Sequence, residues 1–412
     1  MKAITGNRVI RVEKMEYRTS VKRHQALLII LLFALSFALP SVVFSQESTM
    51  KEYPYLYKST RAMGMGGAYT AIGGKVDTLF YNPAGLSAMK QDKGWEVNLI
   101  NLSVEAGEDV RDFSDDMQDA LDTKDLNGDG DDSDDQLRAV NDILAKYRGK
   151  NLHVRVADFT SLGKNSEKIA FGLGGLASFK ADMMTHQGFG PEGFLDVNAD
   201  ATYGGIGGVS IKVMDGLFGG FSVKALHRES LVHVFTSREL VAHEDDLDEY
   251  IKKELKVSGS GIGFDAGMLY QFARDSWLKP SAGISVMNIG DMKFGDAGKI
   301  PMTVNAGIAV NPSVPVFKAL TIGLDYVDIL NNFEQDSDKG KRLRLGGELQ
   351  LFDAAAAAMA IRAGLYQGYP TFGADLRLLI FSLSYVTYAE EVGAYAGQDK
   401  DRRHLLTLNI GW

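Results

Sequence analysis

"HLLTLNIGW", residues 404–412, ends the chain with a strict alternation of apolar and small or polar residues. In an extended strand, one face would carry the apolar members, Leu406, Leu408, Ile410 and Trp412. The opposite face would carry the small or polar members, Thr407, Asn409 and Gly411. A period of two predicts a β-strand with one apolar and one polar face. Taken alone, the pattern fits a half-buried strand of a soluble sheet as well as a membrane strand.

The same alternation recurs in residues 342–351, 361–366 and 372–378. The polar faces of these segments carry six charged side chains: Arg342, Arg344, Glu348, Arg362, Asp375 and Arg377. In a membrane barrel the apolar faces meet lipid and the six charged side chains line the lumen. There they could pair across neighbouring strands as a structural charge ladder, since partly buried charges are usually paired. Alternatively, they could form an electropositive patch for a carboxylate headgroup.

Loop lengths separate the soluble from the membrane interpretation. We predict fourteen strands, near 94–104, 152–161, 167–181, 199–213, 217–234, 256–274, 280–289, 302–312, 318–328, 341–352, 357–366, 371–378, 381–389 and 403–412. The long connectors follow odd-numbered strands, at 105–151, 182–198, 235–255, 290–301, 329–340 and 390–402, whereas those after even-numbered strands are short. Only the short connector 367–370 departs from this order. Outer-membrane barrels have an even strand number, short periplasmic turns and longer outside loops.

The predicted fold class is therefore an all-β membrane protein, a 14-stranded antiparallel transmembrane β-barrel that occupies residues 93–412. Closing the sheet pairs every backbone polar group without leaving an edge, which hydrocarbon requires. A terminal aromatic residue on an alternating strand resembles the sorting signal that outer-membrane barrels present to their assembly machinery. Trp412 is the candidate for that contact, and the outer-membrane bilayer is the predicted surrounding.

Residues 1–45 combine seven bases with the apolar run ALLIILLFALSFALPSVVF, which predicts a signal peptide cleaved near Ser45. A retained membrane anchor is the alternative, because about 19 apolar residues nearly span a bilayer. Met15 is a second candidate for the start of translation. Without residues 1–45 the chain keeps 37 bases and 51 acids, a net charge of −14, which disfavours nucleic acid as a partner. The chain has no cysteine, so no disulfide contributes to its stability.

Glycine and small residues crowd the segment before the first predicted strand. "RAMGMGGAYTAIGG", residues 61–74, is followed by "DTLFYNPAGLS", residues 77–87. The glycines do not complete G-x-G-x-x-G and no Lys-Ser/Thr pair follows, so a nucleotide site is disfavoured. Glycine permits a compact and irregular backbone where larger side chains would collide. Such a backbone could pass through a narrow lumen.

These two motifs resemble the N-terminal signature of the long-chain fatty-acid transporter (FadL-like) superfamily, which includes PorV-like and TraF-like barrels. "YAEEVGAYAGQDKDRRHLLTLNIGW", residues 388–412, also resembles members of that group. The resemblance implies a fourteen-stranded barrel in which residues 46–92 fold as an N-terminal plug or hatch inside the barrel. By the same resemblance, Asn82, Pro83, Ala84 and Gly85 form the plug or gate, and the glycines of the segment agree with this interpretation. It also implies passive transport of small hydrophobic molecules such as fatty acids. PorV-like and TraF-like members imply an alternative, a non-transporting accessory of secretion or conjugation that docks a protein partner, with a purely structural plug.

The predicted loop 105–151 is strongly acidic, with fifteen acids and six bases in residues 105–150. Within it, DLNGDGDDSDDQ, residues 125–136, has the spacing of a calcium-binding EF-hand loop with a glycine at position 6. The candidate Ca²⁺ ligands are Asp125, Asn127, Asp129, Asp131, Ser133 and Gln136. Gln136 replaces the usual bidentate acid at position 12, so affinity should fall towards the 10⁻⁴ to 10⁻³ M range of extracellular modules. A solvated acidic loop without metal is the alternative.

Helical periodicity flanks this candidate calcium site. Apolar residues recur at Val110, Phe113, Met117 and Leu121, and again at Leu137, Val140, Ile143, Leu144 and Tyr147. We predict two extracellular helices that cap the barrel mouth and bury these stripes against each other. A further helix is predicted in residues 235–255.

The seven histidines form no H-E-x-x-H motif, and the chain contains no G-x-S-x-G nucleophile elbow. A barrel enzyme that hydrolyses lipids with His404 near the rim remains a third candidate function. The sequence favours a non-enzymatic transport barrel.

Overall fold

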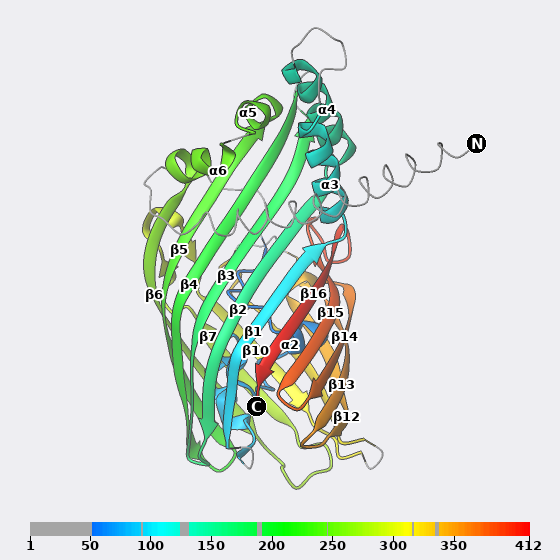
Figure 1. Cartoon of the computed structure of the whole chain (residues 1–412). Helices are drawn as coiled ribbons and strands as arrows, with labels where there is room; N and C mark the ends of the chain where they lie inside the picture. The colour runs from blue at the N-terminus through cyan, green and yellow to red at the C-terminus, as the bar shows by residue number, and fades with distance from the viewer. Residues whose placement is uncertain are drawn as a thin grey trace, which may run out of the picture.

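The computed structural model is a closed barrel of fourteen antiparallel strands (Figure 1). It describes residues 52–91, 94–123, 132–187, 192–244, 246–314, 317–333 and 338–412, without the side chains of residues 132 and 133. The predicted signal peptide, residues 1–45, and the start of the predicted plug lie outside these ranges. The predicted fold class is confirmed.

Each barrel strand pairs with its neighbours in the chain, and the last strand closes the sheet against the first. The barrel strands are β1 (Trp95–Gly107), β2 (Asn151–Asn165), β3 (Ile169–Gln187), β4 (Gly193–Met214), β5 (Leu217–Thr236), β6 (Val257–Gln271), β7 (Ser281–Met287), β10 (Thr303–Val310), β11 (Ala319–Tyr326), β12 (Leu343–Asp353), β13 (Ala357–Tyr366), β14 (Tyr369–Leu378), β15 (Phe381–Glu391) and β16 (Lys400–Gly411). A separate two-stranded sheet, β8 (Met292–Lys293) and β9 (Lys299–Ile300), lies in the β7–β10 connection.

The C-terminal segment closes the barrel. β16 pairs with β15 on one side and with β1 on the other, in register from Ile100↔Ile410 to Gly107↔Arg403. At the end of this seam the backbones of Val97 and Trp412 exchange two hydrogen bonds, of 2.8 and 2.9 Å. The alternating residues 404–412 therefore belong to a strand that is hydrogen-bonded to a neighbour along both of its edges.

Most connectors follow the predicted order of lengths, except that the β3–β4 connector is shorter than the β6–β7 connector, residues 272–280. The long ones gather at the end where Figure 1 shows the helices, and the short turns lie at the end that holds the C-terminus. The connector between β13 and β14 is the predicted exception and comprises only residues 367 and 368. One boundary is wrong: β3 and β4 extend well beyond their predicted ends, so the predicted loop 182–198 shrinks to the five residues between Gln187 and Gly193.

Helices in the long connectors explain why β3 and β4 extend further than predicted. The long connectors contain α3 (Val110–Leu121) and α4 (Asp132–Lys146), as predicted. In place of the single helix predicted in residues 235–255 there are three short segments: α5 (Ser237–Ala242), α6 (Leu247–Tyr250) and the π-helix η5 (Ile251–Leu255). The rings of Phe113 and Tyr147 meet at 5.2 Å between α3 and α4. α4 also packs on β3 and β4, and α3 packs on β2. Phe179 and Ala181 of β3 are buried in the same cluster as the helix residues, and they alternate along β3 with the inward-facing Lys180.

The helices therefore cover the outer face of the extended strands β2 to β5. This corrects the prediction that they cap the barrel mouth. Apolar side chains that would be exposed above the bilayer are buried under the helices, so the strands can continue beyond the membrane.

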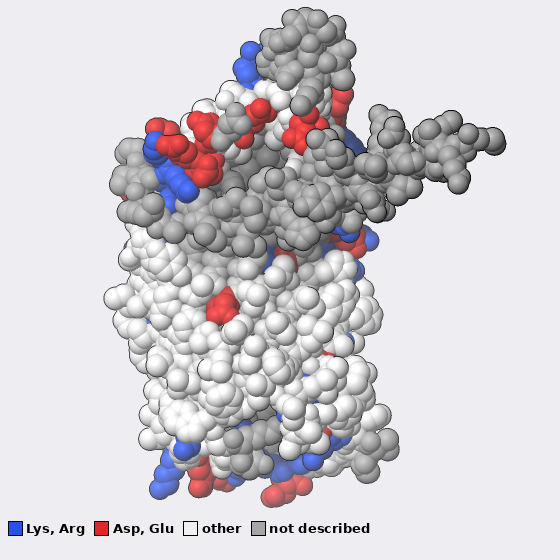
Figure 2. Space-filling model, in the orientation of Figure 1, with Lys and Arg blue, Asp and Glu red and all other residues white. Residues whose placement is uncertain are grey.

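The outer surface below the helices suits a bilayer. Figure 2 shows charged side chains at the two ends of the barrel and an almost uncharged belt between them. Large apolar side chains are exposed on this surface, among them Leu99, Leu102, Leu162, Leu173, Ile211, Phe221, Ile308, Phe372 and Leu408. Such an outward apolar band is characteristic of transmembrane barrels. None of the helices in the described residues is long and apolar enough to cross a membrane.

The plug lies inside the barrel and comprises α2 (Thr60–Gly64) and the 3₁₀ helices η2 (Val76–Phe80) and η3 (Pro83–Ala88). Its apolar residues are buried with those of the wall: Val76, Leu79, Leu86 and Met89 pack with Phe159, Leu176, Ile206 and Leu226. Wall glycines allow its backbone to approach closely. A Cβ at Gly346 would lie 2.2 Å from the carbonyl oxygen of Met65, and one at Gly220 would lie 2.1 Å from the amide nitrogen of Ala84.

Candidate functional site

The side chain of Asn82 connects the predicted gate residues to the barrel wall by hydrogen bonds. Its Oδ1 accepts a hydrogen bond from the Ala84 amide at 3.1 Å, which caps η3. Its Nδ2 donates to the carbonyl oxygens of Thr70 (2.8 Å) and of Met268 in β6 (3.1 Å). Pro83 is the first residue of η3, where its missing N–H is not needed.

Gly85 is buried where the plug folds back on itself. A Cβ there would lie 2.2 Å from Thr78 Oγ1 and 2.9 Å from Gly73 Cα. The four predicted gate residues therefore lie together at a contact between plug and wall. Their role as a gate stays a prediction.

Glu348 joins the plug to the barrel wall. Its carboxylate lies 2.8 Å from Arg61 Nη2 of the plug and 2.7 Å from Arg362 Nε on the neighbouring strand β13. Glu348 and Arg362 are directly opposite in the β12–β13 register. This is the cross-strand pairing expected of the predicted charge ladder, with an additional partner from the plug that sequence reasoning did not identify.

The other four ladder residues make separate local contacts. Arg344 stacks at 4.0 Å over the Tyr366 ring, and Arg342 donates to the Asp328 carbonyl oxygen at 3.1 Å. Asp375 accepts a hydrogen bond from Ser384, and Arg377 pairs with Asp353 at 3.2 Å near the β12–β13 turn. The six side chains thus form one ion pair and four isolated contacts, without a continuous ladder.

A larger group of buried charges lies between the plug and strands β1, β2, β3, β15 and β16. We call it the luminal ion cluster, and its members are Glu52, Lys58, Glu105, His153, Arg155, Lys180, Asp182, Glu390, Asp401 and Arg403. Lys58 Nζ contacts Glu390 at 2.9 Å and Glu105 at 3.2 Å, and it also contacts Glu52. Arg403 lies 2.7 Å from Asp401 and 3.2 Å from Glu52.

These contacts hold the first described residues against the wall. Burial alone would raise the pKa of the Glu52 carboxyl, but Lys58, Arg403 and Arg155 hold that pKa well below its usual range. Breaking such a buried pair leaves an uncompensated charge, so the cluster fixes the position of residues 52–58.

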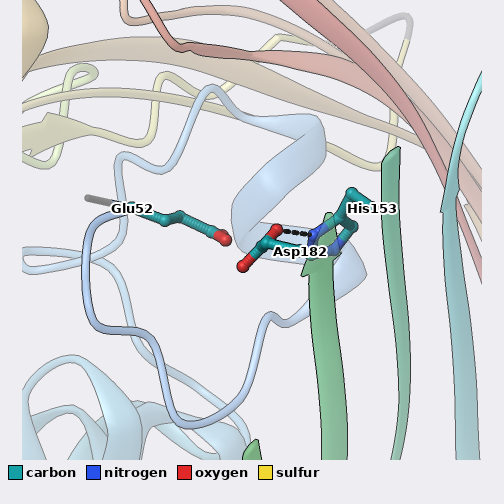
Figure 3. Close-up of side chains that lie close together, drawn as sticks. All are labelled: Glu52, His153 and Asp182. Atoms are coloured by element: carbon teal, nitrogen blue, oxygen red, sulfur yellow. Dashed lines mark hydrogen bonds and ion pairs between the residues drawn. The ribbon is translucent and has the colours of Figure 1, made fainter. Parts of the chain in front are cut away.

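Figure 3 shows the part of the cluster that most resembles a metal site. Ligand atoms of Glu52, His153 and Asp182 lie within 4.8 Å of one another. However, Asp182 is paired with His153 at 2.5 Å and with Lys180 at 3.0 Å, and Arg403 contacts both carboxylates. A divalent cation would enter a group already neutralised by side-chain cations. This donor set therefore does not fit a metal, and we interpret it as part of the ion cluster.

Sequence reasoning did not identify the luminal ion cluster. The predicted first strand ended at residue 104, which left Glu105 in a loop, and His153 and Asp182 stood near predicted strand ends. The sequence does contain one pattern that indicates this cluster. Charged residues recur at every second position of 153–155 and 180–182, as expected for the lumen face of paired strands.

Two cavities share residues 53–56 as a common wall, and the larger one is also lined by Glu52, Arg155 and Lys180 of the cluster. The larger, which we call the luminal cavity, has a volume of about 180 Å³ and is bounded by β2 to β5, residues 53–56 and the β7–β10 connection. The smaller measures about 30 Å³ and lies against Thr70 and Tyr81 of the plug. A volume of that size holds about two water molecules.

The predicted calcium ligands fall largely outside the described residues. Asp125, Asn127, Asp129 and Asp131 lie outside the described residues, as does the side chain of Ser133. Gln136 is described, and its Nε2 donates to the Leu121 carbonyl oxygen (2.8 Å) and to Glu244 (3.0 Å). Its amide nitrogen therefore ties α4 to α3 and to the α5 connection.

His404, the candidate base of a barrel enzyme, lies on the outer surface of β16. Its Nδ1 is 2.6 Å from Tyr385 Oη, and its Nε2 is 3.9 Å from Glu108. Its partners are thus a phenol and a carboxylate.

Neither a protein-family model nor a curated protein matches the chain. Among solved structures, a TodX deltaS2S3 mutant monoaromatic hydrocarbon channel is similar over 86% of this chain and 97% of its own, with 12% identity and a TM-score of 0.50. The toluene transporter TbuX of Ralstonia pickettii is 12% identical over 87% of this chain and 99% of its own, with a TM-score of 0.49. At such identities a likeness concerns the fold alone. The resemblance found in the sequence is confirmed at that level: the chain has the fold of a FadL-like barrel, closed by fourteen strands around an N-terminal plug.

Proposed function

We propose that this protein lies in the outer membrane of a Gram-negative bacterium and lets small, largely apolar molecules, such as fatty acids, diffuse through it passively. The observation that carries the proposal is the luminal cavity of about 180 Å³ beside the plug segment. Clefts and cavities with aromatic walls and a few polar groups are where proteins hold small ligands. The similar folds described as hydrocarbon channels support the proposal by analogy.

Filling the cavity tests this function. Ser178 faces the luminal cavity from β3, and its neighbour Ala177 is exposed on the opposite face. Cells that lack the protein would be complemented with the wild type, with Ser178→Phe or with Ala177→Phe. We expect labelled laurate or toluene uptake to be restored by the wild type and Ala177→Phe, and not by Ser178→Phe. Equal uptake with and without the wild-type protein would refute transport.

The alternative, docking of a protein partner, is favoured by one observation. The α3–α4 hairpin lies beyond the belt of the barrel, and Figure 2 shows acidic side chains gathered at that end. Co-purification of a secretion or conjugation complex that is lost when the hairpin is deleted, together with unchanged solute uptake, would establish this function.

Calcium binding by residues 125–136 also remains a proposal. The spacing of its oxygen ligands supports it, and the helix that begins at Asp132 would follow the bound ion as the exit helix of an EF-hand does. Calcium titration of the whole purified barrel should give a dissociation constant near 10⁻⁴ to 10⁻³ M. Asp125→Asn combined with Asp129→Asn should abolish the heat, and an unchanged titration would refute the site.

A further inference from the structure

The luminal cavity has an aromatic side and a polar side. The aromatic side is formed by the rings of Tyr53, Tyr55 and Phe333 and by Pro54, Leu56, Ile300 and Pro301. The polar side is formed by six charged side chains and by Ser178, Asn198 and Thr202. The two sides adjoin, because Arg155 lines the cavity and its Nη1 donates to the Tyr55 carbonyl oxygen at 3.0 Å. A solute on the aromatic side therefore also lies beside the polar side.

Every charged side chain that lines the cavity is paired within the protein. The basic ones have carboxylate partners: Arg155 pairs with Glu52 (3.6 Å) and Glu105 (3.7 Å), Lys180 with Asp182 (3.0 Å), Arg228 with Asp200 (2.6 Å) and Lys299 with Asp291 (2.9 Å). The two acidic ones, Glu52 and Asp200, are among these partners. A charged solute would lose hydration in the cavity without meeting a free counter-charge, which costs free energy. The cavity therefore favours an uncharged solute.

Three uncharged polar side chains on the same side lack such partners. Ser178 on β3 and Thr202 on β4 are directly opposite in the β3–β4 register, and Asn198 lies four residues before Thr202. Within the residues that the structure describes, these three side chains make no hydrogen bond. Only 7% of Thr202 is exposed. Water or a solute in the cavity must supply their partners, because an unpaired buried polar group costs free energy.

The aromatic side suits a flat ring. The ring centroids of Tyr53 and Tyr55 are 4.5 Å apart, and Phe333 meets Tyr53 edge-on at 6.2 Å. Aromatic pairs attract one another at separations of roughly 4.5–7 Å. A solute ring can extend this group of rings by the same geometry.

A hydroxyl group on that ring distinguishes between solutes of similar shape. A ring that covers the polar side displaces the water there, and a group that cannot reproduce the hydrogen bonds of an ordered water loses affinity. A hydroxyl both donates and accepts, whereas a methyl group does neither. A phenolic hydroxyl, with a pKa of about 10, is uncharged at neutral pH. Phenol therefore fits both sides of the cavity better than toluene does.

We propose that the luminal cavity binds an uncharged phenol. Its ring lies against Tyr53, Tyr55 and Phe333, and its hydroxyl group is hydrogen-bonded to the opposed hydroxyls of Ser178 and Thr202. This inference names a solute class within the proposed transport function and rests on it.

Phenol and toluene test the proposal in one pair of proteins. Isothermal titration of the whole purified barrel at pH 7 would compare the wild type with Thr202→Val, which keeps the branched side chain and removes its hydroxyl. Phenol affinity should fall about fivefold, the effect of one hydrogen bond, and toluene affinity should stay unchanged. Comparing each solute with itself cancels its uptake by detergent. An unchanged phenol affinity, or an equal loss for toluene, would overturn the assignment.

Two further variants locate the site. Ser178→Ala removes the opposed hydroxyl and should lower phenol affinity to a similar extent, so it serves if Thr202→Val does not fold. Thr387→Val is the matched control, because Thr387 lies opposite His404 on the outer face of the barrel. Its phenol affinity should equal that of the wild type. A loss as large in Thr387→Val as in Thr202→Val would overturn the location.

Benzoate tests the preference for an uncharged solute. It should bind the wild-type barrel more weakly than phenol, because the cations of the cavity are already paired. Tighter binding of benzoate than of phenol would overturn the solute class.

The two proposals fail separately. Phenol binding that depends on Thr202, without uptake of any tested solute, would keep the solute class and refute transport. Uptake of toluene or laurate without phenol binding would keep transport and refute the solute class.

Discussion

Single glycines determine how closely the plug lies against the wall. Gly346 and Gly364 face the backbone of the plug at Met65 and Gly66, and Gly283 faces it at Thr70. The plug backbone occupies the volume that a side chain at these positions would need. Close packing of this kind is disturbed even by one additional methyl group.

We predict that Gly346→Ala displaces the plug and costs about 1–3 kcal/mol, the usual range for overpacking. Gly347→Ala is the control, because a Cβ there meets nothing closer than the Thr321 carbonyl oxygen at 3.4 Å. Single-channel conductance in planar bilayers should rise for Gly346→Ala only. Equal conductance of the two variants would show that the plug tolerates the added methyl group.

Glu348 gives a second prediction at this scale. Glu348→Gln leaves Arg61 and Arg362 without a carboxylate, and losing one member of a buried ion pair typically costs about 3–5 kcal/mol. Urea unfolding of the purified barrel should show this loss, whereas Glu167→Gln in an exposed turn should change stability little. A loss below about 1 kcal/mol would mean that water replaces the carboxylate.

Among the buried ion pairs of the lumen, the sequence predicted some and missed others. The pairing of Glu348 with Arg362 could be predicted, because both residues lie on the polar face of regularly alternating strands. The contact between Lys58 and Glu105 could not be predicted, since it joins residues 47 positions apart across the boundary between plug and wall. Local periodicity carries no information about such a pairing.

At the scale of elements, periodicity predicted the strands and the α3–α4 hairpin, but not the surface on which the helices pack. The apolar stripe of α4 fits another helix or a sheet equally well. It meets Phe179 and Leu195 on the outer face of β3 and β4. The same contact explains why β3 extends beyond its predicted end at residue 181 and why β4 begins before its predicted start at residue 199.

Asp116 should make the hairpin sensitive to acid. Hydrogen bonds from Lys146 and Tyr147 hold the pKa of Asp116 below its ordinary value. Because the folded-state pKa is the lower one, this contact stabilises the hairpin fully above about pH 4 and is lost as the pH falls through the folded value. At neutral pH, Asp116→Asn should speed hydrogen exchange in α3 and α4 by up to about fivefold.

Below about pH 3 the difference between Asp116→Asn and wild type should vanish, because the wild-type carboxyl is then protonated as well. Asp115→Asn removes a neighbouring charge whose nearest base, Arg111, is 4.0 Å away. This control should exchange as the wild type does. A difference between Asp116→Asn and wild type that persists in acid would point to a packing effect of the substitution.

At the scale of the whole molecule, strand number and loop order were predictable because a membrane imposes them. An even number of antiparallel strands places the start of the first strand and the end of the last on the same side of the membrane, and outer-membrane barrels keep their short turns on that side. The luminal cavity was not predictable, because its walls combine residues 52–56, four strands and the β7–β10 connection. Its volume depends on how all of these pack.

Trp412 provides the prediction that belongs to the closed barrel. Its backbone completes the β1–β16 seam, while 62% of its surface is exposed. Trp412→Ala should leave the seam intact but reduce the amount of assembled protein in the outer membrane severalfold, if the assembly machinery reads this side chain. Trp277→Ala, equally exposed in the β6–β7 turn, is the control, and immunoblots of membrane fractions give the measurement. Equal levels of both variants would refute the contact.

The plug precedes every strand in the chain, yet it touches the wall from β2 around to β16. At Gly220, Gly283, Gly346 and Gly364 the plug backbone lies too close to the wall for any side chain to stand between them. We therefore expect the sheet to close around residues 52–91, so that the plug is in place before the last strand pairs with the first. The seam between the first and last strands is consequently the step at which the interior becomes sealed, and a hatch supplied as a separate peptide would arrive too late.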